Sequence, residues 1–130
     1  MAAGGMPSRK LRILIIDDSD ILRGAVRALL QEQKDRFDVM ESADAGDAIQ
    51  KARETYPQII LLDLSLPGVS GMELAKRMRA ELPDSKIIVM SAQDPVVLRK
   101  LTELADLELY IVKTELSAEL LPLLQKIAPA

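Results

Sequence analysis

The sequence contains neither cysteine nor histidine, and each absence excludes a kind of chemistry. Without cysteine there is no disulfide framework and no thiol nucleophile, which suits a cytoplasmic protein. Without histidine the chain lacks the commonest general base, the commonest metal ligand and any residue that could carry a phosphohistidine. A metal ion bound by this chain must therefore rest on oxygen ligands.

Basic clusters and long apolar runs are also missing. The net charge is −3 and no run of consecutive basic residues is longer than a pair such as Arg9-Lys10, which argues against a nucleic-acid surface. The longest purely aliphatic runs, Ile13 to Ile16 and Ile59 to Leu62, fall far short of the roughly 20 residues that a membrane helix needs. We therefore expect a soluble protein that binds neither nucleic acid nor membrane.

The 130 residues suffice for one domain of common size. Residues 1–10 are small and glycine-bearing, without the apolar stretch of a signal peptide, and are predicted to be a disordered leader. One domain is expected over residues 11–127, followed by a tail at 128–130. The sequence leaves open whether this domain stands alone or belongs to a longer protein with an output domain.

The stretch IILLDLSLPGVSG, residues 59–71, runs four apolar residues directly into Asp63. A short apolar run bounded by turn residues indicates a strand covered on both faces, as in a parallel sheet flanked by helices. Such sheets bind ligands beyond the C-terminal ends of their strands, where Asp63 would lie. Pro67-Gly68 predicts a loop, and Ser70 with Glu73 has the capping-box spacing that begins a helix.

The same alternation of strand and helix recurs along the chain. Further strands are predicted at residues 11–16, 37–41, 87–90 and 109–112, and further helices at 21–33, 44–56, 95–104 and from near 119. Pro122 would cost about 3 kcal/mol inside a helix, so the last helix is expected to begin near Glu119 or to bend. Five strands alternating with five helices predict an α/β fold with a doubly wound parallel sheet.

Apolar residues at helical spacing predict the buried faces of these helices. The predicted stripes are Ile21, Leu22, Ala25, Val26, Leu29 and Leu30 in the first helix, Ala48, Ile49, Ala52 and Tyr56 in the second, and Val97, Leu101 and Leu104 in the fourth.

Polar residues follow four of the predicted strands, and a parallel sheet would gather them at one edge. The set comprises Asp17, Asp18, Asp63, Ser91 and Lys113. Neighbouring carboxylates repel one another and need a cation, and oxygen ligands without histidine or cysteine favour Mg²⁺. A lysine suits a phosphoryl oxygen, and a carboxylate can itself accept a phosphoryl group as an aspartyl phosphate. Metal, lysine and hydroxyl together stabilise phosphoryl transfer.

These motifs, in this order, resemble the receiver domain of two-component response regulators, the CheY-like family, from about Leu11 to Ile127. LIIDDS resembles the family's acid pair, LLDLSLPGVSG its phosphoacceptor loop, VMSAQ its switch hydroxyl with the small residue after it, and YIVK its aromatic residue and lysine. The resemblance implies a flavodoxin-like, five-stranded sheet of order 2-1-3-4-5 flanked by five helices. It also implies a phosphorylation-controlled signalling switch rather than an enzyme acting on other substrates.

The resemblance assigns a role to each acid at the sheet edge. It makes Asp63 the phosphorylation site, which receives its phosphoryl group from the phosphohistidine of a sensor histidine kinase or histidine phosphotransfer protein. It makes Asp18, Asp63 and the backbone carbonyl of Ser65 the ligands of Mg²⁺, with Asp17 assisting through water. The signal would pass to a downstream protein target or to an output domain.

The remaining motif residues are expected to bind the phosphoryl group and to report its arrival. Lys113, the Ser91 hydroxyl and the Ala92 amide would stabilise the phosphoryl oxygens, while Ser91 and Tyr110 would form the switch pair. Two departures from the family pattern occur. Thr114 stands where the family usually has proline after its lysine, and Asp106-Leu107 stands where it usually has a small pair.

Two other functions are consistent with parts of the sequence. A haloacid-dehalogenase-like phosphatase would use Asp18 as nucleophile and Asp20 as acid, but a second late acid pair and a cap domain are missing from the sequence. A receiver-fold binding module that signals without phosphorylation is favoured by the departures at Thr114 and Asp106-Leu107, whereas the intact set of acids argues against it.

Overall fold

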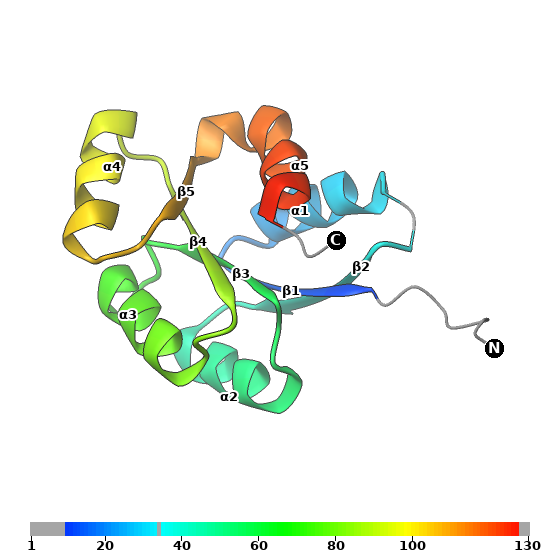
Figure 1. Cartoon of the computed structure of the whole chain (residues 1–130), viewed down its shortest axis with the longest axis horizontal. Helices are drawn as coiled ribbons and strands as arrows, with labels where there is room; N and C mark the ends of the chain where they lie inside the picture. The colour runs from blue at the N-terminus through cyan, green and yellow to red at the C-terminus, as the bar shows by residue number, and fades with distance from the viewer. Residues whose placement is uncertain (1–9, 34, 128–130) are drawn as a thin grey trace.

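The computed structural model describes residues 10–33 and 35–127, so the predicted leader, apart from Lys10, and the predicted tail lie outside the described residues. Strands and helices alternate along the chain. They are β1 (Leu11–Ile16), α1 (Asp20–Gln31), β2 (Phe37–Ser42), α2 (Ala45–Thr55), β3 (Ile59–Asp63), α3 (Gly71–Glu81), β4 (Lys86–Ser91), α4 (Pro95–Leu104), β5 (Leu109–Val112), a 3-10 turn (Lys113–Glu115) and α5 (Leu116–Ile127). All strand pairings are parallel, in the order β2-β1-β3-β4-β5, which confirms the predicted doubly wound sheet (Figure 1).

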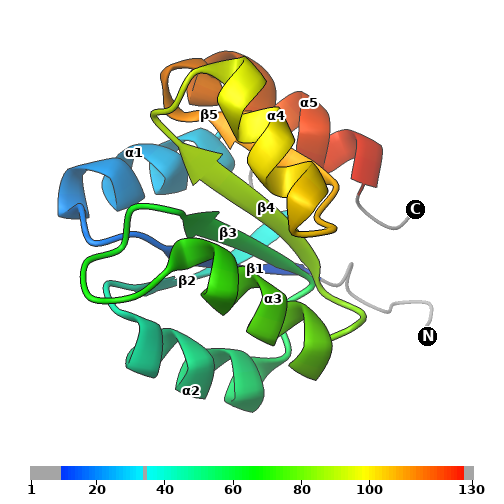
Figure 2. The ribbon, with the colours of Figure 1, turned by 90° about the vertical axis from the view of Figure 1, so that its left-hand side faces the viewer.

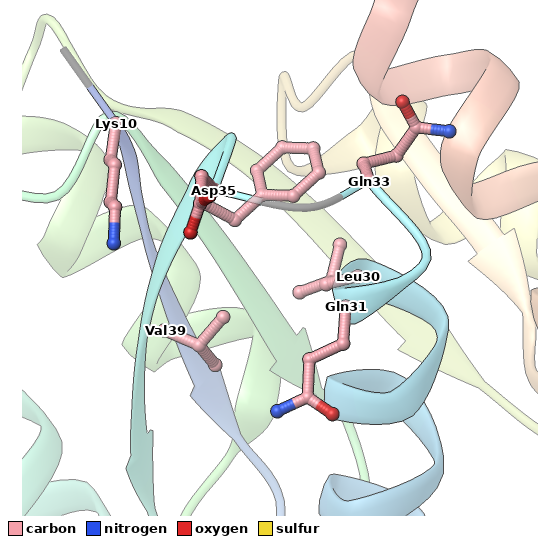
Figure 3. A pocket seen from close by; sticks show the side chains of 7 residues that line it. Lys10, Leu30, Gln31, Gln33, Asp35 and Val39 are labelled. Carbon is pink, nitrogen blue, oxygen red and sulfur yellow. The ribbon is translucent and has the colours of Figure 1, made fainter. Parts of the chain in front are cut away.

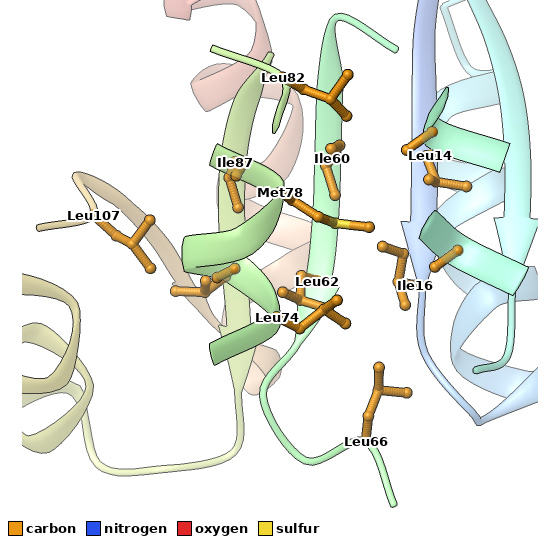
Figure 4. Close-up of a cluster of buried hydrophobic side chains, with 14 of the residues drawn as sticks. Leu14, Ile16, Ile60, Leu62, Leu66, Leu74, Met78, Leu82, Ile87 and Leu107 are labelled. Atoms are coloured by element: carbon orange, nitrogen blue, oxygen red, sulfur yellow. The ribbon is translucent and has the colours of Figure 1, made fainter. Parts of the chain in front are cut away.

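The sheet separates two hydrophobic layers. Successive residues of a strand point to opposite faces, and in β1 Ile13 and Ile15 enter one layer while Leu14 and Ile16 enter the other. Helices α1 and α5 cover the first face, and α2, α3 and α4 cover the second (Figure 2). Figure 4 shows the second layer, in which Met78 of α3 lies against Ile60 of β3. The central strands are therefore buried on both sides, as their unbroken apolar runs predicted.

The helical stripes predicted the helices correctly but not every buried residue. In α1 Val26 and Leu30 are buried as predicted, whereas Ile21 is 86% exposed. In α4 the side chains of Leu98 and Thr102 are buried, whereas Leu104 is 83% exposed. The prediction erred because spacing places residues on a common helix face, while the docking of the helix on the sheet decides which face is covered.

Several predicted boundaries also differ from the structure. The helix α1 ends at Gln31 rather than Gln33. Tyr56 lies beyond α2 in a left-handed conformation (φ 47°) that caps the helix, and its side chain is exposed. The helix α5 begins at Leu116, not near Glu119, because the 3-10 turn at Lys113–Glu115 leads directly into it, and it continues through Pro122.

Among the described residues no helix is long and apolar enough to cross a membrane. No cis peptide bond occurs among them either, so the bond between Lys113 and Thr114 is trans.

Candidate functional site

The end of β3 holds Asp63 in a defined orientation. Its side chain is buried, and the carboxylate Oδ1 accepts a hydrogen bond of 2.9 Å from the backbone N–H of Ser65. The backbone N–H of Leu64, the residue after Asp63, donates to the Met90 carbonyl of β4 at 2.9 Å. The loop after the strand thus turns back on the carboxylate. Ser65, whose carbonyl was expected to act as a ligand, lies two residues after Asp63.

The two acids after β1 differ in their surroundings. Asp17 is fully buried; its amide donates to the Ser42 carbonyl at 3.0 Å, and its Oδ1 accepts from the Ser19 amide at 2.8 Å. Ser19 also caps α1 by accepting from the Leu22 amide. Asp18 is exposed. One carboxylate is therefore part of the fold, and its neighbour faces solvent.

Asp17, Asp18 and Asp63 form one cluster, in which one carboxylate oxygen of each residue lies within 4.8 Å of the others. Within the described chain, Asp17 Oδ2 is the only buried side-chain oxygen or nitrogen without a hydrogen bond of ordinary geometry, and it is ion-paired with Lys113 Nζ at 3.1 Å. Three carboxylates packed this closely fit a hard divalent cation, which needs oxygen ligands and offsets their repulsion. The predicted acids thus meet as expected and fit Mg²⁺.

Lys113 contributes the positive charge of the site. Its Nζ lies 3.1 Å from Asp17 Oδ2 and 3.1 Å from Asp63 Oδ1, and its side chain is 23% exposed. Burial lowers the pKa of Lys113, but its ion pairs with Asp17 and Asp63 outweigh this and hold the pKa above its ordinary value. Lys113 therefore stays charged beside the Asp63 carboxylate.

Ser91 ends β4 at the same edge of the sheet, opposite Val112 of β5, which precedes Lys113. Its side chain is buried, and its hydroxyl accepts a hydrogen bond of 3.1 Å from the Gln93 amide. Ala92 follows on the surface. Tyr110 lies further back in β5, opposite Val89, half-buried against the hydrophobic layer beneath α2, α3 and α4. Ser91 and Ala92 thus lie at the predicted edge, and Tyr110 lies within the sheet.

Gly71 shapes the loop that follows Asp63, and the sequence did not indicate this role. It is buried at the start of α3, and a Cβ there would lie 2.5 Å from Leu64 Cα and 2.6 Å from the Leu64 carbonyl oxygen. Only glycine lets the helix approach the residue after Asp63 so closely. No local signal could have shown this, because the contact joins two ends of a loop whose path only the folded chain defines.

Two pockets are lined in part by residues of α1. One, of about 450 Å³, is an apolar groove between α1 and the start of α5 that reaches Lys113 and includes Leu22, Leu29 and Leu116. The other, of about 290 Å³, lies at the opposite edge of the sheet, beside Phe37 at the start of β2 (Figure 3). Only the first adjoins the acid cluster.

Known proteins share this sequence pattern and fold. The family described as the response regulator receiver domain matches residues 13–125. The nitrate/nitrite response regulator protein homolog of Haemophilus influenzae is 36% identical over 86 residues, which cover 65% of this chain and 41% of that protein. The transcriptional regulatory protein LiaR of Bacillus subtilis is 34% identical over 111 residues, which cover 85% of this chain and 52% of that protein. This chain thus spans about half the length of these curated relatives.

A solved structure shows the same agreement in three dimensions. The crystal structure of a two-component response regulator of the LuxR family from an Aurantimonas species matches with a TM-score of 0.80 and 31% identity. The match covers 92% of this chain and 85% of that chain.

Proposed function

Because this chain belongs to the receiver domains of two-component response regulators, we propose that Asp63 accepts a phosphoryl group and that this modification switches the domain. The observation that supports it best is the position of Lys113, 3.1 Å from Asp63, beside three carboxylates that share a 4.8 Å cluster. Acceptor, cation ligands and phosphoryl-binding charge thus occupy one site.

In the proposed reaction an Asp63 carboxylate oxygen attacks the phosphorus of a partner's phosphohistidine. A P–O bond forms and the P–N bond breaks, so the phosphoryl group moves to Asp63 and the partner's imidazole leaves with the electron pair and takes up a proton. Lys113 pairs with a phosphoryl oxygen in place of the carboxylate, and Ser91 and the Ala92 amide bind the other oxygens.

Asp18, Asp63 and the Ser65 carbonyl would hold Mg²⁺, with Asp17 assisting through water. When bound, Mg²⁺ would neutralise charge on the carboxylates and on the transferred group. The carboxylate oxygens that Asp17, Asp18 and Asp63 offer within 4.8 Å of one another support this assignment.

The proposed phosphodonor is a histidine kinase or a histidine phosphotransfer protein. The apolar groove between α1 and α5 supports docking beside the site, because it ends at Lys113 and so leads an incoming protein toward Asp63. The signal is proposed to pass through Ser91 and Tyr110 to α4, β5 and α5. A target protein or output domain would read this surface, and the chain itself would act on no other substrate.

Intact mass after incubation with a small phosphodonor tests the proposal. The wild type is expected to gain one phosphoryl group in the presence of Mg²⁺, and to gain none after chelation. Asp63→Asn is expected to gain none in either condition. A phosphoryl group on Asp63→Asn, or turnover of phosphomonoesters by that variant, would favour the Asp18 phosphatase instead. Folded wild type that binds Mg²⁺ and gains no mass would favour the binding module that works without phosphorylation.

A further inference from the structure

Arg23 of α1 is the most enclosed cation near the acid cluster that the proposed reaction does not use. Its side chain is 12% exposed, and each nitrogen of its guanidinium meets a different acceptor. Nη1 donates to the backbone carbonyl of Asp17, Nε donates to Glu41 Oε1 at 3.1 Å, and Nη2 donates to Asp20 Oδ1. The guanidinium therefore joins the end of β1, the end of β2 and the first turn of α1.

We propose that Arg23 is a positioning residue for the Mg²⁺ site and acts on Asp18 through the Asp17–Asp18 peptide. This inference rests on the proposed function, because it concerns the same metal site. Arg23 binds a backbone carbonyl and no carboxylate of the cluster, so it would set the place of a ligand without being one.

Arg23 would act on Asp18 through the geometry of the peptide unit that joins Asp17 to Asp18. A peptide unit is planar, so the Asp17 carbonyl oxygen that Arg23 binds also fixes the direction in which the chain continues to the nitrogen and Cα of Asp18. Asp17 itself is already held by Ser42 through its amide and by Ser19 through its carboxylate. Asp18 is exposed, and no hydrogen bond to its carboxylate is found within residues 10–33 and 35–127. Its position therefore depends on its backbone.

The shape of the guanidinium matters as well as its charge. Arginine presents donors in a rigid planar fork, whereas a lysine ammonium is a single point charge. Lysine at position 23 could satisfy one of the three acceptors but could not span all of them. The substitution Arg23→Lys therefore distinguishes a requirement for the planar guanidinium from a requirement for positive charge alone.

An electrostatic role and a positioning role of Arg23 predict opposite effects of its substitution on Mg²⁺ affinity. Neutralising a cation beside an acid cluster makes the site more negative, and by Coulomb attraction alone it would tighten Mg²⁺ binding. Loss of an outer partner that orients a metal ligand typically weakens binding about 10–100-fold. The sign of the change therefore separates a positioning role from a general electrostatic one.

The test is calorimetric titration of the unphosphorylated protein with Mg²⁺. Arg23→Gln and Arg23→Lys are each expected to raise the dissociation constant about tenfold or more. Arg27→Gln is the matched control, because Arg27 binds the same Glu41 carboxylate from α1 without an Asp17 contact. It removes the same charge and is expected to leave the affinity unchanged or slightly tighter.

The outcomes separate the inference from the function on which it rests. Wild type that fails to bind Mg²⁺ refutes the proposed metal site itself. Wild-type or tighter affinity in folded Arg23→Gln or Arg23→Lys refutes the positioning role. Equal weakening by Arg27→Gln also refutes it, since the effect would then belong to Glu41. If neither Arg23 variant folds, Arg23 stabilises the whole domain and the positioning role is likewise rejected.

Discussion

At the scale of single residues, Lys113 shows how one side chain links stability to the site. A group whose pKa is raised on folding stabilises the folded state fully below its unfolded pKa and loses that effect as pH rises through the folded value. The contribution of Lys113 is therefore complete below its ordinary pKa of 10.5 and declines above it.

Lys113→Met is expected to lower the free energy of unfolding at pH 7, because Asp17 and Asp63 lose their cation. The difference from wild type should shrink as pH rises above 10.5. Urea unfolding at a series of pH values measures it. Lys100→Met is the control, since Lys100 is exposed and has no ion pair within the described part of the chain. A difference that stays constant with pH would contradict the role given to Lys113.

Gly71 and Gly24 form a natural pair for testing close packing. At Gly71 an added Cβ would meet Leu64 backbone atoms at 2.5 Å and 2.6 Å, whereas at Gly24 the nearest atom, Arg27 Nη2, is 3.8 Å away. Gly71→Ala is expected to cost about 1–3 kcal/mol through overpacking. Gly24→Ala is expected to stabilise by about 0.5–1 kcal/mol because alanine suits a helix interior. Denaturant unfolding measures both, and equal effects would exclude the proposed clash.

At the scale of elements, α5 carries a proline that the rest of the helix tolerates. Pro122 is exposed inside Leu116–Ile127, and it cannot donate a backbone hydrogen bond to the Ala118 carbonyl one turn earlier. The buried residues Leu116, Leu120 and Leu124 hold the helix against the sheet, which explains why it persists. Tertiary packing here outweighs local propensity.

Pro122→Ala is therefore expected to raise the free energy of unfolding by about 2 kcal/mol. This is the roughly 3 kcal/mol helix penalty reduced by up to about 1 kcal/mol of unfolded-chain entropy. Pro95→Ala provides the contrast, because Pro95 occupies the first position of α4, after the Asp94 cap, where proline is favourable. Pro95→Ala is not expected to raise the free energy of unfolding. A shift of the denaturation midpoint without a change of slope identifies the effect, and its absence would show that α5 has already relaxed around the proline.

At the scale of the whole molecule, the acid cluster would couple folding to the binding of Mg²⁺. Carboxylates from the ends of β1 and β3 lie close together only in the folded domain, so Mg²⁺ should bind the folded state selectively. Such binding adds about 2.7 kcal/mol to the free energy of unfolding at one hundred times the dissociation constant.

We expect Mg²⁺ to raise the thermal midpoint and a chelator to reverse the change. Asp18→Asn should abolish most of the response. Asp84→Asn removes the same charge from an exposed residue between α3 and β4, at the opposite edge of the sheet, and should retain the response. Equal responses in the two variants would show that Mg²⁺ acts through net charge rather than through the cluster.

The amino-acid sequence by itself determined the class of fold and the residues that gather at one edge of the sheet. Aliphatic runs as pronounced as Ile59 to Leu62 require burial on both faces, and a parallel sheet provides it. The acids follow such runs directly, so the strands' common direction brings Asp17 and Asp63 to one edge. These features depend only on which residues are adjacent in the chain, and the sequence states this directly.

The tertiary structure alone decided the contacts between elements that are distant in the chain. The covered face of α4, the approach of Gly71 to Leu64 and the three acceptors of Arg23 each depend on how separate elements dock. Local patterns specify which residues share a helix face but not the angle or height at which the helix meets the sheet. Packing sets both, because side chains from distant segments must fill the same space without voids or clashes.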